Sequence, residues 1–189
     1  SAFCWVASLV SGDTSWVDRL WSIVPVAYVW VFAVSAVADD ADAGRLILMA
    51  VLVTAWGARL TFNFARKGGY SGVEDYRWAI LRGRMSPVLF QVFNLLFIVL
   101  YQMTLLVLIT LPAAMARTHP APLTAADVII TVLFVGFLLG ESVADYQMMA
   151  YQTEKYRRIN NKEPLGEYER GFIETGLWSV SRHPNYFCE

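Results

Sequence analysis

Residues 128–150 read VIITVLFVGFLLGESVADYQMMA, an apolar run that is long enough to cross a bilayer as a helix. Such a crossing needs about 20 predominantly apolar residues. Three further runs, residues 21–38, 46–65 and 88–115, have the same character. Of the 189 residues, 57% are hydrophobic and 16% are charged, whereas soluble domains carry about 25% charged residues. The sequence therefore predicts an all-α fold, a polytopic membrane bundle with at least four spans.

The positive charges between these runs predict how the bundle is oriented. If loops alternate across the membrane, twelve of the fifteen Lys and Arg residues lie on one side, two lie on the other, and Arg59 lies within a span. Such an excess marks the cytoplasmic side, or the matrix side of the mitochondrial inner membrane. Residues 151–189 are then a tail on this basic side. We expect residues 1–189 to form one membrane domain of a longer protein, because the sequence opens without Met inside an apolar segment.

The basic loop between the second and third runs, residues 66–87, has a helix signal of its own. Ser71 and Glu74 have the spacing of a capping box, and Val73, Tyr76 and Ile80 recur behind it at helical spacing. We expect a short helix that lies in the membrane interface with its basic side towards water. A simple connector is the alternative.

Three ionisable residues, Arg59, Glu141 and Asp145, lie inside predicted spans. Such groups are costly in hydrocarbon and usually face a partner or a water-filled cavity. Glu141 and Asp145 are four residues apart, so they share one face of a helix. We expect this face to meet Arg59 in an intramembrane polar cluster. Two interpretations are open: the cluster belongs to a functional site, or it only holds the helices together.

The tail ends in TGLWSVSRHPNYFCE, residues 175–189, where polar and ionisable groups are unusually dense. Pro184 favours an extended conformation for His183 and a helix that begins at the proline. A helix start beside Arg182 would present free N–H groups and a positive charge to an anion. The alternative is an interfacial helix start whose Arg and Tyr lie among lipid headgroups.

Several classes of site find no support in the sequence. There is no Gly-rich dinucleotide motif after a strand and no Walker pattern. The two histidines and two cysteines have no metal-ligand spacing, so no metal site is predicted. A formal net charge of −1 gives no indication of nucleic-acid binding.

Five motifs, in order, resemble the C-terminal region of steroid 5α-reductase-like membrane proteins, specifically the branch known as DUF1295. The terminal motif is Gly176-Leu177-Trp178 followed by residues 181–187 and Glu189, although Cys188 stands where the family usually has Gly. The others are residues 15–22 (SWVDRLWS), 56–60 (WGARL), 74–78 (EDYRW) and 140–147 (GESVADYQ). The resemblance covers nearly the whole chain.

The resemblance implies a membrane enzyme that transfers hydride from NADPH to a carbon–carbon double bond conjugated to a carbonyl in a lipid or steroid. The residues that match the cofactor motif are Arg182, His183, Asn185, Tyr186 and Glu189, with Asp145 as a further contact. No position matches the family's substrate-polarising residues, so the catalytic residues are unassigned.

Two other functions remain open at this stage. One is an S-adenosylmethionine-dependent methyltransferase, because distant relatives share an Arg-His-Pro segment. The other is an accessory membrane subunit of a larger complex, with no cofactor. The expected partners are membrane lipids, a lipophilic substrate and other membrane subunits, in the endoplasmic reticulum or the mitochondrial inner membrane.

The charge asymmetry gives a direct test of topology. Single cysteines introduced at Asp40 and Ser71 should react with membrane-impermeant reagents from opposite sides of the membrane. Labelling of both positions from one side would contradict the predicted orientation.

Overall fold

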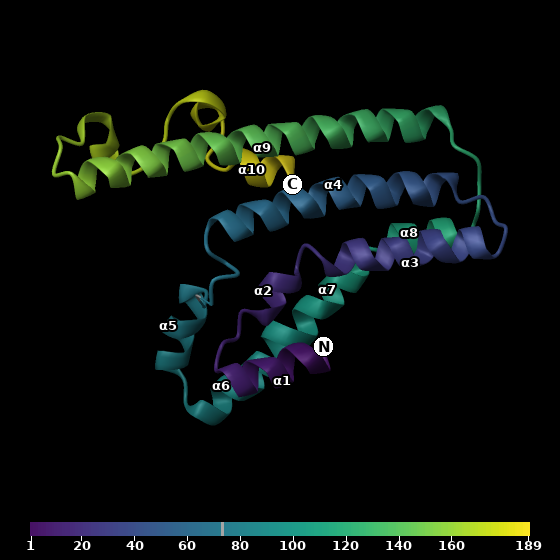
Figure 1. Ribbon diagram of the computed structural model, residues 1–189, viewed down its shortest axis with the longest axis horizontal. Coiled ribbons are helices and arrows are strands. Elements are labelled where there is room, and N and C mark those ends of the chain that lie inside the picture. The colour runs from purple at the N-terminus through teal and green to yellow at the C-terminus, as the bar shows by residue number, and fades with distance from the viewer. Residues whose placement is uncertain (73) are drawn as a thin grey trace. The chain divides into compact units, whose positions relative to one another are not determined.

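The structure is a computed structural model that describes residues 1–72 and 74–189. Every regular element in these residues is a helix (Figure 1). The predicted all-α class is therefore confirmed. The chain divides into two compact units, Ser1–Thr124 and Ala125–Glu189.

The first unit contains α1 (Ala2–Ser11), α2 (Trp16–Leu20), α3 (Val24–Ala38), α4 (Gly44–Arg66), α5 (Tyr76–Arg84), α6 (Pro87–Phe93), the π-helix η1 (Asn94–Tyr101), α7 (Gln102–Leu108) and α8 (Leu111–Thr118). The second contains α9 (Ala125–Asn160), the 3₁₀ turns η2 (Gly166–Arg170) and η3 (Gly176–Ser179), and α10 (Pro184–Cys188).

Four helical stretches of the described chain are long and apolar enough to cross a membrane. They are Trp16–Ala38, Gly44–Arg66, Pro87–Leu108 and Ala125–Asn160. The predicted membrane bundle with four spans is confirmed. At 36 residues, α9 is longer than a span of about 20 residues requires, and its last turns carry the charged residues of the tail.

The apolar run 88–115 is divided in the structure. Its helix ends at Leu108, and α8 begins at Leu111 with a proline in its first turn. Pro112 has no N–H to donate to a preceding turn, so it is suited to start a new helix and not to continue the old one.

Close packing of α3 and α4 depends on a glycine in the WGARL motif. A Cβ atom added to Gly57 would lie 2.6 Å from the carbonyl oxygen of Ser22, so only glycine permits this approach. Ala33, Ala36 and Ala50 are also almost fully buried, in a cluster that α3, α4 and α8 form together. Small residues let two backbones approach closely, as is common between membrane helices.

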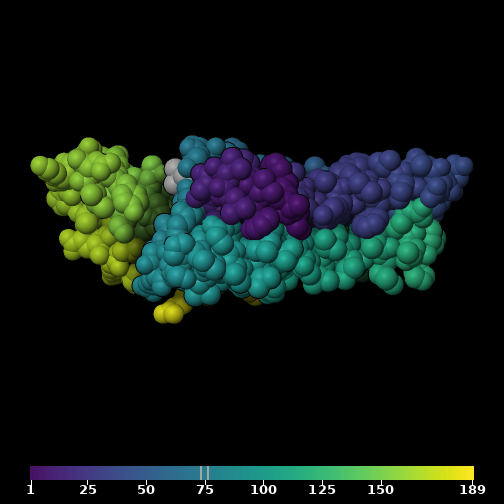
Figure 2. All heavy atoms as spheres, turned by 90° about the horizontal axis from the view of Figure 1, so that it is seen from below, coloured from purple at the N-terminus to yellow at the C-terminus, as the bar shows by residue number. Residues whose placement is uncertain are grey.

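The SWVDRLWS and EDYRW motifs meet in the first unit. Glu74 Oε1 accepts hydrogen bonds from the backbone N–H of Thr14 at 2.9 Å and from its hydroxyl at 2.7 Å. The indole of Trp78 donates to Asp18 at 3.0 Å. In the same unit, α1 lies against the third helical stretch, as the purple and teal atoms of Figure 2 show.

A helix does form in the basic loop, but the predicted capping box is wrong. The N-cap of α5 is Asp75, whose carboxylate accepts from the backbone N–H of Arg77. Ser71 instead donates to the carbonyl of Gly68, and Glu74 is engaged by Thr14. Val73, part of the predicted pattern, lies outside the described residues.

In the second unit, a narrow stripe of α9 carries the C-terminal segment. Ala144 and Gln147 lie on this stripe, at the three-residue spacing that places side chains on one helix face. The indole N–H of Trp178 donates to the Ala144 carbonyl at 3.0 Å. The Gln147 carboxamide oxygen accepts from the backbone N–H of Leu177, also at 3.0 Å.

One turn earlier on α9, the same stripe packs against α10. A Cβ atom on Gly140 would lie 2.9 Å from the Cys188 sulfur. The ring of Phe137 contacts that of Phe187 edge-on, with centroids 6.3 Å apart. Gly140 thus makes room for the Cys188 side chain.

The Asp75 cap predicts a pH dependence of α5. Side-chain hydrogen bonds from Arg77 hold the pKa of Asp75 below its usual value. The cap therefore stabilises α5 at every pH above the ordinary aspartate pKa of about 3.9, and this contribution is lost as pH falls through the lowered value. Protection of the α5 amides from hydrogen exchange, measured relative to the intrinsic rate at each pH, should fall only below that range.

Asp75→Ala should lose about 1 kcal/mol of local stability at neutral pH. Asp75→Asn keeps a capping side chain but cannot titrate, so it should remove the acid dependence. If the wild type and Asp75→Asn respond to acid alike, Asp75 is not the titrating group.

Gly176 should be needed where the C-terminal segment meets α9. Its φ is +61°, and a Cβ atom there would lie 2.4 Å from Gln147 Nε2. Gly166 also has a positive φ, +56°, but has nothing within 4 Å of that position. Both alanine variants should lose about 1–2 kcal/mol to backbone strain. Gly176→Ala should lose about 1 kcal/mol more, because Gln147 must release Leu177.

Amide exchange at Leu177, compared between the two variants, measures the difference. In a Gln147→Ala background the two glycine substitutions should become equivalent, because the obstructing side chain is gone. An unchanged difference in that background would show that the clash is elsewhere.

Candidate functional site

The terminal motif forms a turn followed by the short helix α10. As the sequence predicts, α10 begins at Pro184 and His183 is its N-cap residue, with φ −141° and ψ 68°. The His183 ring lies between two aromatic rings, 6.4 Å from that of Trp178 and 5.5 Å from that of Tyr186 between centroids. The imidazole is thus held by aromatic contacts and remains exposed.

Two of the predicted cofactor residues come into contact in this unit. The Asn185 Nδ2 donates to Asp145 Oδ1 at 3.4 Å, joining α10 to α9. The opposite atom of the same carboxamide, Oδ1, is buried and accepts no hydrogen bond. Buried polar atoms nearly always have a partner. The orientation that Asp145 imposes on Asn185 therefore leaves an acceptor available.

Arg182 differs from the other arginines of residues 125–189, all of which are described. Arg157 and Arg158 both pair with Glu154, and Arg170 pairs with Glu174. Arg182 is exposed and makes no ion pair in this unit. Its guanidinium is therefore available to an anion without breaking an existing ion pair.

Tyr186 and Glu189 are also exposed, Tyr186 to 69%. No hydrogen bond joins either side chain to Asn185 or Arg182 among the described residues. The structure thus brings Asn185 and Asp145 together and places His183 against Tyr186. It does not bring Arg182 and Glu189 into that contact.

The predicted intramembrane cluster is divided between the two units. Glu141 is only 2% exposed and lies on α9 four residues before Asp145. Arg59 lies on α4 of the first unit. The meeting of Arg59 with this acidic face stays a prediction.

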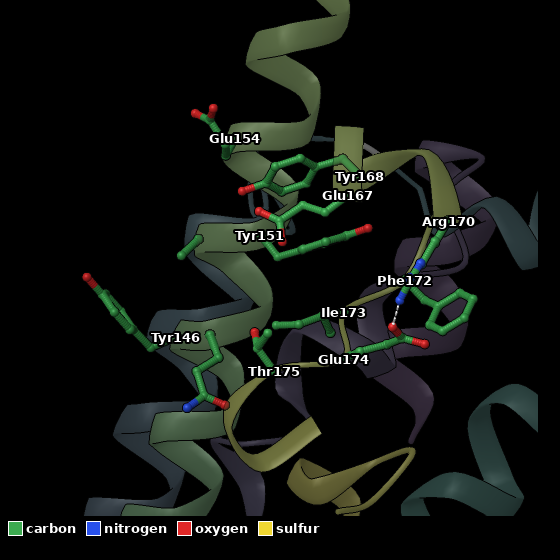
Figure 3. A pocket seen from close by; sticks show the side chains of 12 residues that line it. Tyr146, Tyr151, Glu154, Glu167, Tyr168, Arg170, Phe172, Ile173, Glu174 and Thr175 are labelled. Carbon is green, nitrogen blue, oxygen red and sulfur yellow. Dashed lines mark hydrogen bonds and ion pairs between the residues drawn. The ribbon is translucent and has the colours of Figure 1, made fainter. Parts of the chain in front are cut away.

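A cavity of about 650 Å³ lies between the last turns of α9 and residues 167–175 (Figure 3). Sequence reasoning missed it. Tyr151 and Glu154 line it from α9, at the positions that continue the stripe of Ala144 and Gln147. Their spacing of four and three residues was the available signal. Gln147 itself lines the cavity, so the cavity directly adjoins the terminal motif.

The cavity is lined by tyrosines and carboxylates. The rings of Tyr151 and Tyr168 lie 5.0 Å apart, and the Tyr151 hydroxyl is buried with no hydrogen-bond partner. Glu154 and Glu174 are each neutralised by arginine. Glu167 makes no ion pair within residues 125–189. The described residues contain no group of three or more His, Cys, Asp or Glu that could hold a metal ion.

Comparison with known proteins gives the family. Residues 4–189 match the family described as "Protein of unknown function (DUF1295)". An uncharacterized protein of Schizosaccharomyces pombe (strain 972 / ATCC 24843) is 36% identical over 195 residues. That alignment covers 98% of this chain but 57% of the relative, so the chain spans little more than half of that protein. No solved structure matches. The chain belongs to the DUF1295 family of membrane proteins.

Proposed function

We propose that the chain belongs to a membrane-bound, NADPH-dependent reductase that acts on a carbon–carbon double bond conjugated to a carbonyl in a lipophilic substrate. The observation that carries the proposal is the Asn185 carboxamide, held by Asp145 with its oxygen buried and unpaired. A polar ligand bound at this position would give the atom the partner that it lacks.

The unpaired Asn185 oxygen is a hydrogen-bond acceptor, and NADPH has donors that could bind to it. Because Asn185 Nδ2 is used by Asp145, the group that remains is an acceptor for a ligand N–H or O–H. NADPH offers both, in its nicotinamide carboxamide and its ribose hydroxyls. An unpaired buried acceptor costs about 1–3 kcal/mol, and a ligand donor would recover part of this.

Arg182 supplies the second requirement, a charge for phosphate. Arginine is well suited to phosphate because its planar guanidinium donates two parallel hydrogen bonds. Arg182 is exposed and has no carboxylate partner in its unit. His183, whose ring contacts those of Trp178 and Tyr186, offers a further N–H donor beside it.

The bound cofactor would supply hydride, and the chain would supply binding and orientation. Asn185 and Asp145 would hold a polar part of the cofactor, and Arg182 and His183 would bind its phosphates. The membrane spans suit a substrate that partitions into lipid. An endoplasmic reticulum or mitochondrial inner membrane location would place the motif on the cytoplasmic or matrix side, respectively.

NADPH binding to the full-length protein tests the proposal. Arg182→Ala should weaken the affinity by about 1.5–3 kcal/mol, the range for a charge-assisted hydrogen bond, which is roughly ten- to more than a hundredfold. Asn185→Ala should weaken it by about 1 kcal/mol. Arg84→Ala, an exposed arginine on α5 that also makes no ion pair among the described residues, is the control and should leave affinity unchanged.

Titration with S-adenosylmethionine distinguishes the alternatives. Binding of S-adenosylmethionine but not NADPH would replace the reductase with a methyltransferase. If the protein binds neither at millimolar concentration, the enzyme proposal fails and the accessory-subunit interpretation stands.

A further inference from the structure

We propose that the cavity at the charged end of α9 binds a primary organic ammonium ion, a function separate from the cofactor motif. The cavity has a volume of about 650 Å³ and is bounded by α9 on one side and residues 167–175 on the other (Figure 3). Its charge, its aromatic lining and one buried hydroxyl all favour this class of ligand.

Charge is the first criterion. Three carboxylates line the cavity, from Glu154, Glu167 and Glu174, against one guanidinium, from Arg170. Arg157 and Arg158 neutralise Glu154 from outside the lining, and Arg170 neutralises Glu174. Glu167 is left without an ion pair in this unit. Glu167 is therefore the lining carboxylate that is left for a cationic ligand to pair with.

Aromatic rings are the second criterion. Tyr168 already receives a cation, because the Arg158 guanidinium lies over its ring at 4.9 Å from the centroid. Tyr151 packs beside Tyr168 and faces the same cavity (Figure 3). The negative face of a tyrosine ring attracts ammonium ions as it attracts guanidinium.

The Tyr151 hydroxyl selects among cations. It is buried without a partner, and its oxygen can accept a hydrogen bond. A primary ammonium has three N–H donors, enough for both this oxygen and a carboxylate. A quaternary ammonium has none and would leave the hydroxyl unpaired.

Two sources could supply this group, an aminophospholipid headgroup or a soluble amine. The apolar run of α9 ends near residue 150, and the cavity begins at Tyr146 and Gln147. It therefore lies at the depth of lipid headgroups, where tyrosines are common. An interfacial tyrosine belt with no ligand is the competing explanation.

Calorimetry with n-butylammonium tests the chemistry on the full-length protein in nonionic detergent micelles, which contribute no cation. Neutral n-butanol and tetramethylammonium are the comparison probes. We expect n-butylammonium to bind at least tenfold more tightly than either. Glu167→Gln should weaken its binding about tenfold, and Tyr151→Phe a few-fold.

Glu169→Gln is the matched control. Glu169 lies in the same 3₁₀ turn as Glu167, is exposed, and does not line the cavity. Equal effects of the two substitutions would overturn the proposal, and so would equal binding of n-butanol. Competition between NADPH and n-butylammonium would assign the cavity to the cofactor and also overturn it, while leaving the proposed reductase intact.

Nanodiscs identify the source of the ammonium group. Discs that contain phosphatidylethanolamine and phosphatidylcholine should yield protein that retains phosphatidylethanolamine in native mass spectrometry, and Glu167→Gln should lose this enrichment. This result assigns the site to a lipid headgroup. Binding of n-butylammonium without lipid enrichment assigns it to a soluble amine. Absence of both overturns the proposal and supports the tyrosine belt.

Discussion

The structure depends on one constraint, that a chain in lipid must satisfy its backbone hydrogen bonds internally. Four long apolar helices meet it. Binding sites often use irregular backbone, because its N–H groups are free to donate to a ligand. In a lipid-exposed chain such backbone is expected where a span ends. Residues 161–183 follow the charged end of α9, and outside the two 3₁₀ turns η2 and η3 their backbone is irregular. The cavity is formed there because α9 extends past its apolar run and gives it a rigid support. The terminal motif packs one to three turns earlier, against residues 137–147 of the same helix.

Helix positions followed from composition, whereas helix ends depended on distant partners. Spans are recognisable because apolar length alone defines them. The cap of α5 was different, since Ser71 and Glu74 had suitable local spacing but Glu74 is engaged by Thr14, sixty residues earlier. Tertiary hydrogen bonds override local capping preferences in this way, and one sequence does not reveal them. The break before α8 was only partly predictable. Pro112 indicates a helix start there, but the apolar run continues past it without interruption.

The candidate site was predicted in part for a related reason. Asn185 and Asp145 were chosen from motifs far apart in the chain, and the structure joins them through a hydrogen bond. The cavity was missed because its walls come from two segments, neither distinctive by itself. Tyr151 looks like an interfacial tyrosine in the sequence. Only the packing of residues 167–175 against α9 shows that its hydroxyl is buried. Their spacing shows that Ala144, Gln147 and Tyr151 share one face of a helix. It does not show which segment packs against that face.

The distribution of charge in the second unit separates two kinds of ligand. Glu154 and Glu174 are neutralised by the arginines beside them, so these groups hold the turns together and add little net field. Arg182 at the terminal motif and Glu167 at the cavity are among the charged groups that make no ion pair in this unit. The two proposed sites therefore call for ligands of opposite charge, an anion at Arg182 and a cation at Glu167. Two such ligands would pair with both groups and leave every existing ion pair intact.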